Sequence, residues 1–138
     1  MKLKLFFMIL LAVGLSYGVT ACAPAVNLPE RAMPAGASFT GIWYSDEFGQ
    51  MKITVNPDNT MHGTFEYRHG EINGTVEGGV MKFEWIQPGD FQVARREVSG
   101  HAYLVISDDG LEMKGAWGYG DNYDGGGKWT GRKATEIY

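Results

Sequence analysis

Cysteine is almost missing from this chain, which has one cysteine, Cys22, among 138 residues. A single cysteine cannot close a disulfide within the chain, so an apolar core has to hold the fold together. Basic clusters are missing too, and the formal net charge is −4. This charge balance excludes the electrostatic footprint of a nucleic-acid-binding protein, and we expect no nucleic-acid partner.

The motifs of common catalytic sites are also absent from the sequence. It contains no Gly-x-Ser-x-Gly, no His-Glu-x-x-His and no phosphate-binding loop. His62, Glu66 and Arg68 fall on one side of an expected strand, but that side is predicted to face solvent. We therefore predict no catalytic residue, no metal site and no cofactor, and we expect that the protein is not an enzyme.

An apolar run, residues 5–19, follows the basic Lys2 and Lys4 and ends in Val19-Thr20-Ala21-Cys22. This segment resembles the signal of bacterial lipoproteins, in which small residues precede the modified cysteine. The resemblance implies that residues 1–21 are a removable signal peptide and that Cys22 carries acyl chains such as palmitate. An ordinary secretory signal or a transmembrane anchor of about 20 residues is the alternative.

Lipid on Cys22 predicts a bacterial cell-envelope protein whose contact with the membrane is covalent. Each buried methylene contributes about 0.8 kcal/mol, so two or three chains anchor firmly. Ala23 follows the cysteine, where an Asp would favour the inner membrane in enteric-type bacteria, so we expect the outer membrane. Whether the domain faces the periplasm or the cell surface is left open. Residues 22–38 contain Pro24, Pro29 and Pro34, and predict a semi-extended linker that spaces the domain some tens of ångströms from the bilayer.

A short pattern with a central glycine recurs along the rest of the chain. In Met61-His62-Gly63-Thr64-Phe65 alternate residues are apolar, as in a half-buried antiparallel strand. Related segments centre on Gly41, Gly74, Gly115 and Gly131. Repeated strand glycines indicate a sheet that must curl into a small barrel; bulges in an open sheet or sandwich are the alternative.

Residues 39–134 are therefore predicted to form one all-β domain, an antiparallel up-and-down meander of about eight strands closed into a barrel. Residues 91–98 are ambiguous between a loop and an irregular strand. Tyr67 has the same parity as Met61 and Phe65 and is expected to face inward. The expected strands are Thr40–Ser45, Met51–Val55, Met61–Arg68, Glu71–Glu77, Val80–Ile86, Gly100–Ile106, Leu111–Trp117 and Lys128–Lys133.

The opening of this domain resembles a known family of barrels. Gly41-Ile42-Trp43-Tyr44-Ser45 and Gly63-Thr64-Phe65-Glu66 are similar to the first strands of avidin- and streptavidin-type proteins, and the Gly-x-Trp is similar to that of lipocalins. The resemblance implies a calycin-like barrel. It implies no ligand-binding residue here, because the later strands do not match the family's binding set.

Two groups of residues are candidates for a binding site. The alternation places Trp43, Phe65, Trp85, Trp117 and Trp129 on the inward face, where they either fill the barrel or line a pocket for a small apolar or sugar ligand. The second group is the expected loop 118–127, which offers Tyr119, Asp121, Asn122, Tyr123 and Asp124. This loop is interpreted as a flexible connection, a sugar-binding surface or a weak ion site.

The sequence thus favours a lipid-anchored envelope protein whose barrel is a non-catalytic binding or interaction module. One alternative is a structural lipoprotein with a filled barrel that contacts a partner protein of the envelope. An enzyme acting on glycan or lipid is the least favoured function. The oligomeric state is left open.

Overall fold

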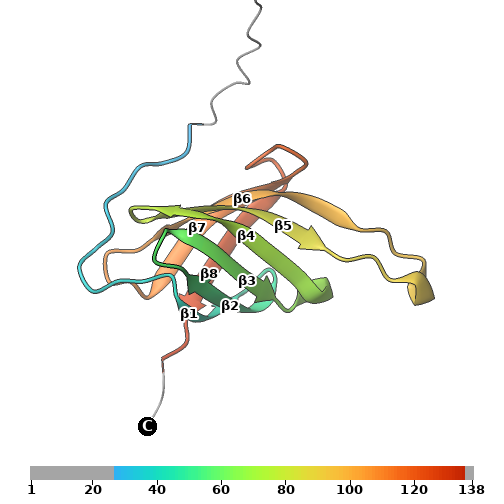
Figure 1. Cartoon of the computed structure of the whole chain (residues 1–138), viewed down its shortest axis with the longest axis horizontal. Helices are drawn as coiled ribbons and strands as arrows, with labels where there is room; N and C mark the ends of the chain where they lie inside the picture. The colour runs from blue at the N-terminus through green and yellow to red at the C-terminus, as the bar shows by residue number, and fades with distance from the viewer. Residues whose placement is uncertain (1–26, 136–138) are drawn as a thin grey trace, which may run out of the picture.

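The computed structural model describes residues 27–135, and nearly all regular structure in this range is strand (Figure 1). The predicted signal peptide and the attachment site Cys22 lie outside the described residues. No helix within 27–135 is both long and apolar enough to cross a membrane. The elements are β1 (Gly41–Ser45), β2 (Gly49–Val55), β3 (Thr60–Phe65), η1 (Tyr67–His69), β4 (Gly70–Glu77), β5 (Val80–Gln87), η2 (Phe91–Val93), β6 (Val98–Ile106), β7 (Glu112–Tyr119) and β8 (Gly127–Lys133), where η marks a 3-10 helix.

The eight strands form a closed barrel in which each strand pairs antiparallel with the next one along the chain. β1 and β8 close the ring through the pairs Trp43↔Lys133 and Tyr44↔Arg132. This arrangement confirms the predicted all-β up-and-down meander and excludes the open sheet. Closure also removes the exposed strand edges that an open sheet would present to other chains.

The repeated glycines lie where neighbouring strands approach each other closely. A Cβ on Gly74 of β4 would overlap the backbone carbonyl of Lys82 on β5 and would lie 2.7 Å from the Phe83 Cβ. A Cβ on Gly115 of β7 would likewise overlap the carbonyl of Tyr103 on β6. Without side chains at these positions, adjacent strands can coil tightly enough to close a narrow ring.

The middle of the barrel is filled by apolar side chains. As predicted, Trp43, Trp85 and Trp129 point inward and are buried, whereas Trp117 is half-buried and packs against the edge of the core. Flexible methionine side chains fill the remaining gaps. The other buried apolar residues are Phe39, Met51, Ile53, Met61, Phe65, Ile72, Val80, Met81, Phe83, Ala102, Leu104, Ile106 and Met113.

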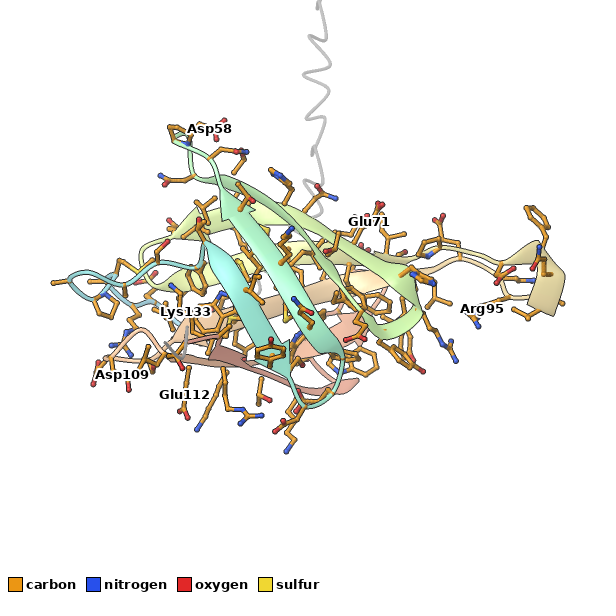
Figure 2. The ribbon with its side chains drawn as sticks, turned by 90° about the horizontal axis from the view of Figure 1, so that it is seen from below. Asp58, Glu71, Arg95, Asp109, Glu112 and Lys133 are labelled. Carbon is orange, nitrogen blue, oxygen red and sulfur yellow. The ribbon has the colours of Figure 1, made fainter. Side chains whose placement is uncertain are left out.

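The two ends of the barrel are built differently. Successive hairpins place their connections alternately at one end and the other, as an up-and-down meander requires. Figure 2 shows the two ends, with Asp109 labelled near one and Arg95 near the other. We call one end the mouth; it carries connections 46–48, 66–69, 88–97 and 120–126. The other, which we call the sealed end, carries connections 56–59, 78–79 and 107–111.

Residues 27–39, which we call the strap, close the sealed end. Phe39 is buried, and Met33 and Ala37 pack against the core beside it. The strap has no regular secondary structure, but its apolar side chains cover core residues that solvent would otherwise reach. Burying them removes apolar surface from water.

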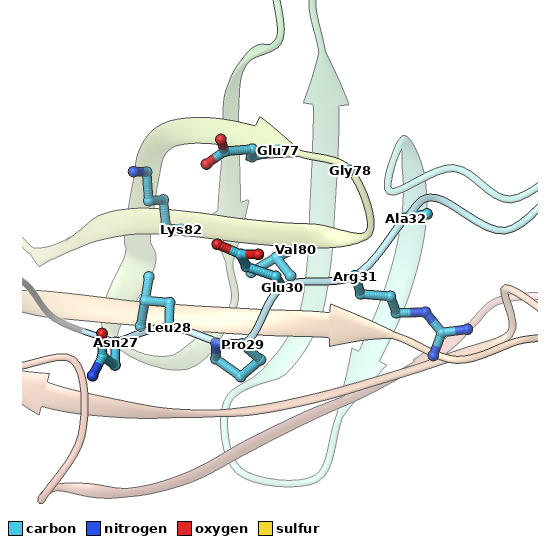
Figure 3. A pocket seen from close by; sticks show the side chains of 10 residues that line it. All are labelled: Asn27, Leu28, Pro29, Glu30, Arg31, Ala32, Glu77, Gly78, Val80 and Lys82. Atoms are coloured by element: carbon cyan, nitrogen blue, oxygen red, sulfur yellow. The ribbon is translucent and has the colours of Figure 1, made fainter.

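Figure 3 shows residues 27–32 of the strap beside the β4–β5 hairpin, where the two segments line a pocket. Polar contacts also hold the strap to the barrel. The Gly79 N–H in the β4–β5 turn donates to the Arg31 carbonyl at 2.7 Å, and the Arg31 guanidinium pairs with Asp108. The sequence predicts a spacer over residues 22–38. The described part of that segment, residues 27–38, lies against the barrel.

The ambiguous segment 91–98 belongs to a projecting hairpin, which we call the arm (residues 88–97; Figure 1). Asp90 and Arg95 exchange two backbone hydrogen bonds of 2.9 Å that close its tip. The Asp90 carboxylate accepts a further hydrogen bond from the Gln92 N–H at the start of η2. The Phe91 side chain, at 105% relative exposure, packs against nothing.

Most predicted strand boundaries differ from the observed ones by one or two residues, and the differences at the ends of β3 and β7 change the mouth. The third strand ends at Phe65 because the chain turns there, with positive φ values of 52° at Arg68 and 55° at His69. Tyr67 therefore leaves the alternation and is 46% exposed instead of facing inward. β7 runs on to Tyr119, which shortens the predicted loop 118–127 to the connection 120–126.

We expect Gly74→Ala to lower the free energy of unfolding by about 1–3 kcal/mol, because the new methyl group overlaps the β5 backbone. Gly120→Asn is the matched control: no atom lies within 4 Å of its Cβ position, and its φ of 58° suits asparagine. Chemical denaturation followed by tryptophan fluorescence measures both. Equal effects would contradict the close-approach explanation.

We expect Phe39→Ala to cost about 3–5 kcal/mol of stability, because it empties a buried position beneath the strap. Phe91→Ala removes the same side chain from a fully exposed position on the arm, so it should change stability by less than about 0.5 kcal/mol. Thermal and chemical denaturation give both values. Similar stability of the two variants would mean that the strap does not contribute to the fold.

Candidate functional site: the aromatic mouth

A cavity of about 410 Å³ opens at the mouth of the barrel. Its size falls within the range of small-molecule sites, and most of its lining is aromatic. The connections 46–48 and 66–69 contribute to its rim, and the ends of β3, β5, β7 and β8 supply its wall. The lining residues are Glu47, Phe48, Phe65, Tyr67, Arg68, Trp85, Gln87, Trp117, Tyr119 and Trp129.

The aromatic rings of the wall pack against one another, mostly edge to face, and the Phe48 and Trp129 rings are tilted by 55°. Trp117 lies at the centre, with ring centroids 5.7 Å from Trp85 at 84° and 5.1 Å from Tyr119 at 83°. Phe48 closes the other side, 4.4 Å from Trp129 and 5.9 Å from Trp117. Such pairs are favourable beyond the area they bury, so the rings have fixed orientations before any ligand arrives.

The cavity has a solid floor. The Trp129 ring packs edge-on against Phe65 at 5.3 Å and Phe83 at 5.1 Å, and its indole N–H points to the Met51 sulfur at 3.3 Å. These contacts lie within the buried core described above. The site is therefore a shallow cup at the mouth, too short for a long acyl chain inserted along the barrel axis.

One polar side chain reaches the cavity from inside the barrel. Gln87 is the last residue of β5, is only 8% exposed and lines the cup. Within residues 27–135 the Gln87 side-chain amide forms no hydrogen bond. Its amide atoms are not fully enclosed, because Arg31 Nε is the one fully enclosed side-chain polar atom in this range without a partner. The Gln87 amide therefore offers a donor and an acceptor to a polar group of a ligand in the cavity.

The buried indole N–H groups are already engaged. The Trp85 Nε1 donates to the carbonyls of His101 and Gly118, both at 3.2 Å, which ties β5 to β6 and β7. The Trp129 Nε1 is directed into the core. These two tryptophans can therefore offer a ligand their ring surfaces, but not their N–H donors.

Arg68 places a cation on the rim of the cup. Its guanidinium lies over the Tyr67 ring, 5.2 Å from the centroid, where cation–π attraction favours it. Among the described residues Arg68 belongs to no salt bridge; those found join Arg31 to Asp108, Arg132 to Asp46 and His101 to Glu84.

Four of the five predicted pocket residues meet at this cavity: Phe65, Trp85, Trp117 and Trp129. Trp43 does not, because its ring is fully buried and its indole N–H donates to the Phe39 carbonyl at 2.8 Å, toward the sealed end. The alternation of strand residues gives the inward direction correctly for all five. It cannot say at which height in the barrel each side chain ends.

The predicted loop residues divide into two groups. Tyr119 ends β7 and lines the cup, while Tyr123 stacks on His101 with centroids 5.0 Å apart. Asp121, Asn122 and Asp124 are exposed and lie outside the cup. Within the described range no cluster of three or more His, Cys, Asp or Glu side chains is arranged to hold a metal ion.

Gln87, Phe48 and Arg68 are site residues that the sequence reasoning missed. Gln87 has the same parity as Met81, Phe83 and Trp85, so the alternation of β5 could have identified it as inward-facing. Phe48 gives no such signal because it lies in a connection. Arg68 was expected on the solvent face of a strand, and it reaches the rim only because β3 ends early.

Glu47, which also lines the cavity, adds side-chain contacts at the junction between β1 and β8. We call this junction the seam. The Glu47 carboxylate accepts hydrogen bonds from the Thr130 N–H at 2.9 Å, the Thr130 hydroxyl at 2.9 Å and the Ser45 hydroxyl at 3.1 Å. Burial raises the pKa of Glu47, but the hydrogen bonds from Thr130 and Ser45 outweigh it and hold this pKa below its ordinary value. The ionised carboxylate thus joins the chain just after β1 to the middle of β8, beyond the point where the pairing of these two strands has stopped.

We expect Glu47→Gln to weaken the seam at neutral pH and to reduce the loss of stability in acid. Because the folded pKa lies below the unfolded one, the contribution of Glu47 is present above the unfolded pKa and is lost as the pH falls through the folded pKa. Unfolding midpoints between about pH 6 and pH 3 measure this. Glu112→Gln, at an exposed position on β7, is the control. Identical profiles of stability against pH for both variants would contradict the role of Glu47.

Comparisons with known proteins complete the description of the site. No protein-family model matches the chain. No curated protein shows significant similarity to it. No solved structure matches it either.

Proposed function

We propose that this protein is a lipid-anchored lipoprotein of the bacterial outer membrane whose barrel binds a small molecule without chemical conversion. The N-terminal resemblance to lipoprotein signals supports the anchor, with Cys22 as the acylated residue. The aromatic mouth supports the binding role. A small apolar or sugar molecule suits it, because rings of fixed orientation surround a cup of about 410 Å³.

The observation that carries this proposal is the Gln87 side chain. A residue used only to fill the barrel would be apolar, as Met81, Phe83 and Trp85 are on the same face of β5. Instead the mostly buried Gln87, whose side chain forms no hydrogen bond among the described residues, lines a preformed aromatic cup. Convergence of a few polar groups within an apolar cavity is the usual form of a small-molecule site.

The filled barrel restricts the kind of ligand. A carrier of long acyl chains needs a deep interior, but the space below Trp129 is occupied by Phe83, Met51 and other core residues. The ligand therefore sits at the mouth, where its far side meets solvent or the rim connections.

A second function is favoured by the arm. Phe91 is fully exposed and Val93 is 59% exposed, although both lie on a hairpin whose backbone is closed by hydrogen bonds. An ordered apolar tip of this kind suits contact with a partner protein. In this second proposal the protein is a structural envelope lipoprotein, and its barrel presents the arm.

Mass spectrometry of the full chain, extracted from its host's envelope in mild detergent, tests these proposals. We expect the denatured mass to show loss of residues 1–21 and gain of acyl groups, a gain that Cys22→Ala abolishes. We expect the native mass to exceed the denatured mass by that of one small molecule. Trp117→Ala should lose this molecule, whereas Phe91→Ala should keep it.

Equal native and denatured masses, with no ligand recovered, would contradict the binding proposal. In that case the structural proposal predicts that the wild-type chain co-purifies with an envelope protein and that Phe91→Ala does not. An unmodified Cys22 in a chain that retains residues 1–21 would contradict the lipid anchor.

A further inference from the structure

The rim of the cup carries a guanidinium, that of Arg68, which belongs to no salt bridge among the described residues. Arg68 has φ 52°, and its guanidinium is placed over Tyr67 beside the cavity. A positive φ is uncommon for a residue with a side chain, and here the turn after β3 imposes it. The turn therefore directs a guanidinium to the rim, at a position that the strand pattern alone would have given to solvent.

Three acidic side chains at the mouth, those of Glu47, Glu66 and Asp46, have other partners. Glu47 lines the same cup, but its carboxylate accepts hydrogen bonds from Thr130 and Ser45. The Glu66 carboxylate accepts from the Gln50 N–H at 3.1 Å. Asp46, at the end of β1, pairs with Arg132 at 3.2 Å. The rim thus has a guanidinium that can bind a carboxylate in the two-pronged manner typical of arginine.

The interior of the cup requires other chemical groups of a ligand than the rim does. The Gln87 amide offers both a donor and an acceptor, and the half-buried Trp117 and the fixed rings around it offer apolar faces. A ligand that satisfies all of these groups has an apolar ring face, hydroxyl groups on its edge and one carboxylate. Hydroxyl groups both donate and accept, which matches the amide.

We infer that the mouth binds an acidic sugar, a ring with hydroxyl groups and one carboxylate, which Arg68 holds at the rim and Gln87 at the interior. This inference rests on the proposed function, because it names the class of ligand for the same cup. The neutral amide alone would accept an uncharged sugar equally well. The preference for an acidic sugar comes from Arg68.

Titration of the full chain in detergent, followed by tryptophan fluorescence, tests the inference. The probes are glucuronate, glucose and benzoate, which separate the carboxylate from the sugar ring. We expect glucuronate to bind about tenfold or more tightly than glucose, as a charge-assisted hydrogen bond provides. Arg68→Gln should remove this preference while leaving the unfolding midpoint unchanged, because Arg68 is exposed. Arg96→Gln, on the exposed arm, should keep the preference.

A Gln87→Leu variant tests whether the interior amide recognises the hydroxyl groups of the sugar rather than a carboxylate. We expect it to weaken glucuronate and glucose by similar factors and to leave any binding of benzoate unchanged. Equal affinities for glucose and glucuronate, or a preference that survives Arg68→Gln, would overturn the role of Arg68. Tight benzoate binding would instead assign the cup to aromatic acids and overturn the sugar.

The outcomes also separate this inference from the proposed function. If none of the probes binds but the native mass reveals another small molecule, the acidic-sugar inference fails and the binding function stands. If no probe binds and the native mass is that of the chain alone, both fail.

Discussion

Closure between β1 and β8 is the constraint on which the rest of this structure depends. Two residue pairs join these strands, compared with the seven pairs that join β4 to β5. The Glu47 carboxylate continues the seam by binding Thr130 where the backbone ladder has ended. Closure brings Trp129 on β8 against Phe65 on β3, and this contact is the floor of the cup. The binding proposal therefore depends on a join that is short and partly made by a side chain.

The two ends of the barrel show how one fold can provide both stability and a site. At the sealed end Phe39 of the strap is buried, and Met33 and Ala37 pack against the core beside it. At the mouth aromatic rings are exposed on one side only, and the pairs Trp85–Trp117 and Phe48–Trp129 fix their orientation. Preorganised rings lose little conformational freedom when a ligand binds, which favours affinity in a small cup.

Alternation along single strands predicted the inward direction of the tryptophans, because side-chain direction in a strand is a local property. The same rule would have found Gln87, which follows Met81, Phe83 and Trp85 on one face. It failed at Tyr67 and Arg68, because it assumed that β3 continues beyond Phe65. Prolines indicate an extended chain over residues 22–38, but they do not indicate what the described part of it, residues 27–38, packs against.

The local pattern of residues was thus sufficient for the class of fold, since apolar alternation and repeated glycines require strands that curl. It was sufficient as well for the set of side chains that point inward. Only the tertiary structure decided that Phe65, Trp85, Trp117 and Trp129 meet at one end while Trp43 lies beneath Phe39 toward the other. The reason is physical: the height of a side chain in a barrel depends on the register between strands, and pairing between distant segments sets that register.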